Sequence, residues 1–237
     1  GQIDRRILLE ADSLESADWK VTIVALPKHG NNTGNDPRVT RINARQRPFS
    51  TNNLILTFYR WFRKYGPSNG PSVRRMKGVL WRSLMGGRSI LVRLFAEEAV
   101  RLSPKVVVAH DLPMLPIACH IARRCGAKIV YDSHELYCEQ EFSTRERKDW
   151  AVLEDRYIRE CDAVITVNPL IARELKRRYR LNDVHILFNA ARLYEPPPRL
   201  RLFHTAFNLK EGDSVLIYQG GISSGRGIEK LTEAFMH

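Results

Sequence analysis

The chain has 237 residues, of which 43% are hydrophobic and 27% are charged, a composition typical of a globular protein. The formal net charge of +12 attracts phosphate groups, whether in nucleic acid, in anionic lipid or on a phosphorylated substrate. No apolar run approaches the roughly 20 residues that span a bilayer, and the four cysteines include no CxxC pair, which favours reduced thiols over disulfides or a zinc site.

The first elements are a helix and a strand. Residues 4–18 predict an amphipathic helix with Asp4 as its N-cap, because apolar side chains recur there at helical spacing. The run KVTIVAL at 20–26 predicts a strand, and a second, short strand is expected at 39–43. A doubly wound domain normally begins with a strand, whereas this chain begins with a helix.

The segment 54–93 holds nine basic residues, no acidic residue and several interleaved aromatic side chains. One interpretation is a surface that contacts anionic headgroups or a lipid-linked phosphate, with Arg74, Arg75 and Lys77 as contact residues. The other is that the aromatic side chains pack on a sheet and the basic side chains are solvated. Nucleic acid fits less well, since no nucleic-acid-binding motif accompanies the charge.

A strand–helix–strand unit follows a helix at 90–102. The apolar run 106–109 precedes His110-Asp111, residues 113–125 have helical periodicity, and the apolar run 129–131 precedes Asp132-Ser133-His134-Glu135. Parallel strands of such a unit place their carboxyl ends at one edge of the sheet. Because open parallel sheets build their sites at that edge, we expect the two polar groups to lie together there.

The remaining elements continue the alternation of helix and strand. Helices are expected at 145–160 and 168–179, and strands at 163–167 and 184–188. We expect the strands near 20–26, 105–110, 128–132, 163–167 and 184–188 to form one parallel sheet.

A proline linker at 195–198 then leads to a short helix at 200–207, a strand at 214–219 outside the first sheet, and a helix through Met236. The turn between the last two, 220–227, is rich in glycine. A strand, such a turn and a helix N-terminus can bind an anion, although a plain tight turn has the same composition.

The segments HDLPMLPIA and GAKIVYDSHELYCEQ resemble the N-terminal domain of family-4 glycosyltransferases, retaining enzymes of the GT-B fold. The resemblance implies an α/β fold: a Rossmann-like parallel sheet in 1–195 that lacks the family's usual first strand. It also implies a linker and a truncated start of a second Rossmann-like, nucleotide-sugar-binding domain in 196–237. The acidic donor-binding motif of the family has no counterpart in the sequence, so we expect the chain alone not to transfer sugar.

The resemblance also assigns roles. His134 corresponds to the family histidine at the junction of sugar and acceptor, where it orients them by hydrogen bonding; the alternative is that it caps the turn that follows. The expected acceptor-binding residues are His110, Asp111 and Glu135, although both carboxylates would equally suit ordinary loop positions. The expected donor-binding residues are Gly220, Gly221 and Arg226, but Ile222 stands where many members have a second arginine.

The implied function is transfer of a sugar from a nucleotide-sugar donor to a lipid-linked or saccharide acceptor in surface polysaccharide biosynthesis. No metal or other cofactor is expected, no nucleic acid partner, and a cytoplasmic location, with peripheral attachment to the inner face of the cell membrane left open. One alternative is an inactive remnant that binds acceptor or membrane. Another is a hydrolase whose metal is held by Asp111, Asp132, His134 and Glu135.

Overall fold

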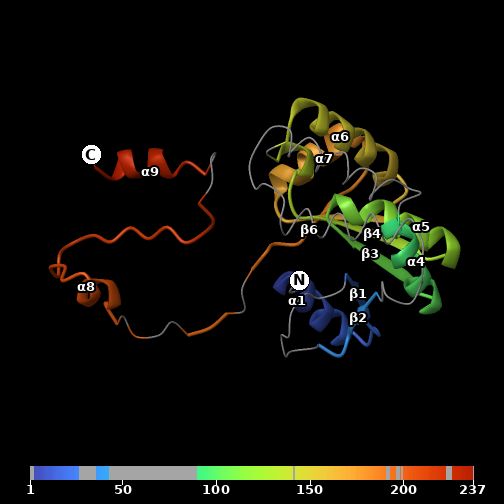
Figure 1. Cartoon of the computed structure of the whole chain (residues 1–237), viewed down its shortest axis with the longest axis horizontal. Helices are drawn as coiled ribbons and strands as arrows, with labels where there is room; N and C mark the ends of the chain where they lie inside the picture. Colours follow the sequence, from blue (N-terminus) through green and yellow to red (C-terminus); the bar gives the residue numbers. More distant parts are fainter. Residues whose placement is uncertain are drawn as a thin grey trace. The chain divides into compact units, whose positions relative to one another are not determined.

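The computed structural model describes residues 3–26, 36–42, 90–140, 142–190, 193–195, 198, 200–222 and 226–236. The chain divides into two compact units, Gly1–Ala190 and Ala191–His237 (Figure 1). Most of the basic segment 54–93, including Arg74, Arg75 and Lys77, lies outside the described residues, so both interpretations of it stay open.

The first unit alternates strands and helices, as predicted. Its helices are α1 (Arg5–Glu15), α4 (Ile90–Arg101), η1 (Leu112–Met114), α5 (Leu115–Cys125), η2 (Tyr137–Glu139), α6 (Thr144–Ile158) and α7 (Pro169–Tyr179). Its strands are β1 (Ile23–Ala25), β2 (Val39–Arg41), β3 (Val106–His110), β4 (Lys128–Ser133), β5 (Ala163–Thr166) and β6 (His185–Ile186).

Four of these strands form a parallel sheet in the order β3-β4-β5-β6. Helix α5 packs on β3 and β4, and α7 packs on β5 and β6. All four strands run in the same direction, so the carboxyl ends of β3 and β4 meet at one edge, as the sequence predicts.

The prediction that the strand at 20–26 joins this sheet is wrong. Strand β1 instead pairs in parallel with β2 in a separate two-stranded sheet. Neighbouring strands bond only when they lie about 4.8 Å apart, and no strand in the described part of the chain bridges β1 and β3. Arg38 binds this small sheet to α1, because its guanidinium contacts Asp12 at 2.8 Å and Glu15 at 3.1 Å.

Local signals in the sequence explain where the helices begin and end. Ser143 and Glu146 form a reciprocal capping box at the start of α6, and the Asn168 side chain accepts two backbone N–H groups at the start of α7. Gly126 ends α5 in the left-handed conformation (φ 67°), which costs glycine little.

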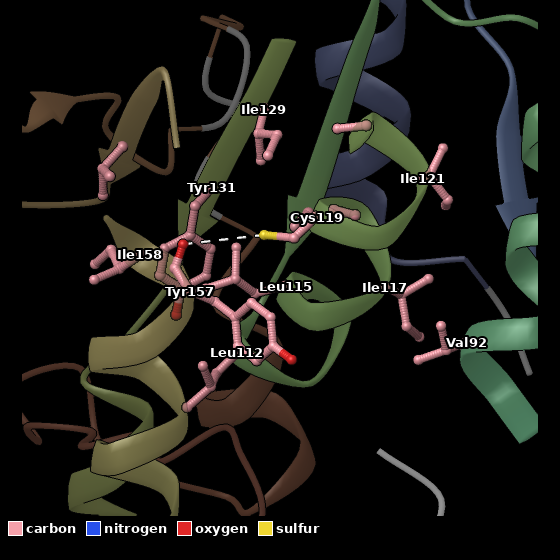
Figure 2. Packing of buried hydrophobic residues seen from close by; sticks show 14 of the residues in the cluster. Val92, Leu112, Leu115, Ile117, Cys119, Ile121, Ile129, Tyr131, Tyr157 and Ile158 are labelled. Atoms are coloured by element: carbon pink, nitrogen blue, oxygen red, sulfur yellow. Dashed lines mark hydrogen bonds between the residues drawn. The ribbon is translucent and has the colours of Figure 1, made fainter. Parts of the chain in front are cut away.

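The hydrophobic core lies between α5, the sheet and α6 (Figure 2). Leu112, Leu115 and Tyr131 are completely buried, and the Cys119 thiol lies 4.0 Å from the carbonyl oxygen of Tyr157. All four cysteines are free thiols, as predicted.

A buried polar network lies beside this core. The carboxylate of Glu154, which is 2% exposed, accepts hydrogen bonds from the Tyr131 hydroxyl at 2.8 Å, the Tyr179 hydroxyl at 2.6 Å and the Cys138 thiol at 3.3 Å. Burial raises the pKa values of all three donors, that of Cys138 to about 12, so each keeps its proton. One side chain of α6 therefore links β4, η2 and α7.

The second unit contains α8 (Leu202–Ala206) and α9 (Ile228–Phe235), close to the predicted helices. The predicted strand at 214–219 is not formed. A strand needs a partner for its backbone N–H and C=O groups, and no described segment pairs with these residues. None of the described residues after Ala190 is buried.

No helix within the described ranges is long and apolar enough to cross a membrane.

Candidate functional site

The two polar groups predicted to meet do lie at one edge of the sheet. His110, the last residue of β3, is in register with Asp132 of β4. The backbone N–H of Asp111 donates to the carbonyl oxygen of Asp132 at 3.0 Å, which extends the ladder past the end of β3. The side chain of His134 joins them from the residues after β4.

Asp132 holds the two histidines together. Its Oδ2 atom lies 3.2 Å from His110 Nδ1 and 2.7 Å from His134 Nε2. The imidazole rings meet edge to face, with centroids 5.7 Å apart and planes at 73°. Asp132 is only 7% exposed, so the contact is sheltered from water. Asp132 is not among the acceptor-binding residues that the sequence predicts.

Helix α1 contributes two further residues, Arg6 and Glu10, for which the sequence predicts no role at this site. Glu10 Oε2 lies 3.5 Å from His110 Nε2. The charge of Arg6, which pairs with Asp4 at 2.7 Å, acts on Asp111 and Asp132. Arg6 and Glu10 stand four residues apart on one helix face. The spacing of Arg6 and Glu10 in the sequence predicts that they share a helix face, but it does not predict which residues of other elements that face contacts.

Electrostatics favour an ionised Asp132 beside protonated imidazole. Burial opposes ionisation of Asp132, but hydrogen bonds from His110 and His134 outweigh it and lower the pKa to about 2. The hydrogen bond to Asp132 raises the pKa of His134 above its ordinary value of 6.5, although burial works against this. Burial also raises the pKa of Glu10.

Asp111 has an unusual backbone conformation, with φ 65° and ψ 157°. This region is occupied almost exclusively by glycine, and a residue held there costs of order 1–3 kcal/mol. Among the described residues its carboxylate has no hydrogen-bond partner, so the strained turn presents an acidic group at the edge.

The alternative considered for His134, that it caps the turn that follows, is not what the structure shows. The turn η2 begins at Leu136 without a side-chain cap, and the His134 ring bonds to Asp132. The Nδ1 atom of His134 is buried and has no hydrogen-bond partner.

Glu135 does not join the cluster formed by His110, Asp132 and His134. Its side chain is exposed and accepts a hydrogen bond from Gln140 Nε2 at 2.6 Å. This contact corresponds to the ordinary loop position that the sequence left open for Glu135.

One ligand atom each from His110, Asp132 and His134 lies within 4.8 Å of the others, which is close enough to share a cation. This set differs from the four residues considered from the sequence. It contains His110 and lacks Asp111 and Glu135, and the Glu135 side chain is bonded to Gln140 instead. Two imidazoles and a carboxylate suit a divalent transition metal. A cation would have to displace the protons that both rings share with Asp132.

The predicted donor-binding residues lie in the second unit. Gly220, Gly221 and Arg226 are exposed, and α9 begins after Gly227 (φ 70°) without a side-chain cap. Residues 223–225 between them lie outside the described part.

A known family matches the part of the chain that contains this sheet edge. The family described as "Glycosyl transferase 4-like domain" matches residues 3–190, which include both strands and all residues of the cluster. No curated protein matches the chain. The match covers most of the sequence and the whole four-stranded sheet, and the chain therefore belongs to the glycosyl transferase 4-like domain family.

Proposed function

We propose that the first unit is the acceptor side of a retaining glycosyltransferase of GT-B architecture. The donor is a nucleotide-sugar, and the acceptor is a lipid-linked or free saccharide used in surface polysaccharide biosynthesis. Family membership supports glycosyl transfer in general. The observation that carries the finer proposal is the convergence of His110, Asp111, Asp132 and His134 at the carboxyl edge of β3 and β4.

Each residue has a role in this proposal. His134 orients the sugar and acceptor by hydrogen bonding, the Asp111 carboxylate accepts hydrogen bonds from acceptor hydroxyl groups, and His110 accepts or donates them. Glu135 stands at the exposed margin and contacts the acceptor only if the Gln140 contact opens.

On the donor side, Gly220 and Gly221 let the backbone approach the nucleotide-sugar, and Arg226 stabilises the leaving diphosphate. Transfer proceeds without a metal, since the cationic side chain and the backbone N–H groups supply the charge compensation.

The 237-residue chain alone should give no turnover. Among the residues described after Ala190 there is no strand and no buried side chain, which supports this expectation. Incubation with UDP-, GDP- and ADP-sugars plus membrane extract tests this, and sugar transfer above a blank would contradict it. The same observation favours the second candidate, a protein that binds acceptor or membrane without catalysing transfer.

Acceptor binding separates the proposed site from an unrelated pocket. Calorimetric titration with saccharides and with a short polyprenyl-phosphate-linked sugar should show saturable binding to the chain. His134→Ala should weaken this binding about tenfold, the effect of one or two lost hydrogen bonds. His185→Ala, at an exposed position of β6, is the matched control. Equal loss in both variants, or no binding of either acceptor class, would refute the acceptor assignment.

A peripheral position at the membrane is proposed from the basic segment alone. Near anionic lipid each basic side chain contributes on the order of 1 kcal/mol. Co-sedimentation with anionic vesicles should therefore weaken at high salt, and changing Arg74, Arg75 and Lys77 to Glu should remove most of it. Equal binding to neutral vesicles would show that the basic residues have another purpose.

A further inference from the structure

We infer that Asp132 is a positioning residue which fixes the tautomers of both site histidines, because one of its carboxylate oxygens accepts a hydrogen bond from each ring. Oδ2 of Asp132 lies 3.2 Å from His110 Nδ1 and 2.7 Å from His134 Nε2, while Glu10 of α1 makes only an ion-pair contact with His110, at 3.5 Å. The importance of Asp132 for sugar transfer rests on the proposed function, but the two hydrogen bonds do not.

The protonation of the two rings follows from the single oxygen they share. An ionised carboxylate can only accept hydrogen bonds. Oδ2 of Asp132 faces both His110 Nδ1 and His134 Nε2, so both nitrogens must carry a proton. Neutral His110 is therefore the Nδ1–H tautomer, and neutral His134 is the Nε2–H tautomer.

The other nitrogen of His110 faces a carboxylate. With Nδ1 already donating to Asp132, the Nε2 atom of His110 lies 3.5 Å from Glu10 Oε2, which is an ion-pair distance and longer than an ordinary hydrogen bond.

The His134 ring is held in one fixed orientation. Its Nδ1 atom is buried and unpartnered, so a neutral ring keeps a sheltered acceptor there while Nε2 donates to Asp132. Carboxylates act on this ring from β4 (Asp132), from the turn after β3 (Asp111) and from α1 with its cap (Glu10 and Asp4), against the positive charge of Arg6. Without Asp132 the ring would be free to turn and to exchange tautomers.

The test is a ¹⁵N spectrum of the ¹³C,¹⁵N-histidine-labelled chain, recorded without sugar. The wild type should show the Nε2–H form of His134 and a protonated Nδ1 on His110, with both protons protected from exchange. Asp132→Asn should abolish this pattern and lower the pKa of His134. Asp155→Asn, at an exposed ion pair on α6, should leave both rings unchanged.

A second variant keeps the test decisive if Asp132→Asn does not fold. Glu10→Gln should shift the signal of His110 Nε2, which lies 3.5 Å from Glu10, and leave the tautomer of His134 as in the wild type. A wild-type His134 protonated on Nδ1 when neutral would overturn the inference, as would rings unaffected by Asp132→Asn in a folded protein.

Titration with Zn²⁺ distinguishes a site in which both histidines donate protons to Asp132 from a site that binds a cation. The inference predicts that both N–H signals persist at neutral pH with equimolar Zn²⁺. Stoichiometric Zn²⁺ binding with loss of both signals would overturn it. If the tautomers are as expected but no acceptor binds, the proposed function fails and the role of Asp132 in fixing the tautomers stands.

Discussion

Two apolar runs of similar composition differ in secondary structure and in burial in this protein. Residues 106–109 (VVVA) form β3 and pair with β4, and the last of them is 1% exposed. Residues 215–218 (VLIY) form no strand and are between 37% and 56% exposed. The difference lies in their partners, since β3 has a neighbouring strand and a covering helix. An apolar run indicates that a segment can form a strand. Whether the strand forms depends on whether the rest of the fold supplies a neighbouring strand and a covering helix.

Hydrogen exchange should show the largest difference between the two runs. Backbone amides in β3 and β4 are laddered and covered, so we expect protection of roughly 10³-fold or more, set by opening of the whole unit. Amides of 214–219 should exchange at nearly the rate of an unfolded peptide. Strong protection of 214–219 would mean that these residues have a strand partner after all.

The first unit should also depend on its buried polar network, which has no counterpart among the described residues of the second. Glu154→Ala leaves the hydroxyls of Tyr131 and Tyr179 without an acceptor, and should cost about 3 kcal/mol in chemical denaturation. Glu154→Gln retains one acceptor oxygen and should cost less than half as much. Equal losses would show that shape, and not hydrogen bonding, is what Glu154 contributes.

The contact between Asp132 and His134 should make the first unit's stability depend on pH. The pKa of Asp132 is lowered to about 2, so its contribution is present above the unfolded value near 4 and is lost as pH falls towards 2. The pKa of His134 is raised, so its contribution is present below about 6.5 and is lost as pH rises through the higher folded value.

Denaturation of wild type and Asp132→Asn from pH 4 to 9 checks this. The variant should be less stable by about 1–2 kcal/mol near pH 5–6, and by less at pH 9. A difference that does not vary with pH would rule out the charge-assisted contact.

The smallest effect is expected at the strained turn after β3. Asp111→Gly should raise the free energy of unfolding by about 1 kcal/mol, because glycine adopts its conformation without strain. Arg180→Gly is the matched control, since Arg180 has the ordinary left-handed conformation (φ 53°, ψ 44°) and should gain less. Acceptor binding should weaken in Asp111→Gly only. A destabilised Asp111→Gly would mean that the turn carries no strain.

Much of the first unit could be predicted because its signals are local. Asn168-Pro169 fixes the start of α7, Gly126 fixes the end of α5, and an apolar run followed by polar residues marks the edge of the sheet. The separate pairing of β1 with β2 could not be predicted, because it depends on which strands find a neighbour.

The site was predicted in part for the same reason. His110, Asp111 and His134 stand directly after strands, so the sheet edge locates them. The roles of Asp132 and Glu10 depend on contacts across elements, one of them between α1 and β3. No local sequence pattern predicts such a contact. Glu135 is the opposite case, because it is next to His134 in the sequence but its side chain binds Gln140 instead of joining the site.

The most direct test of the account compares the two regions in one titration. The chain contains seven histidines, of which His110 and His134 lie at the proposed acceptor site and His204 lies in the second unit. Adding a saccharide or polyprenyl-phosphate-linked acceptor to the histidine-labelled chain should shift the His110 and His134 signals and leave His204 unchanged. Shifts confined to His204, or no shift with either acceptor class, would contradict an acceptor site at the edge of β3 and β4.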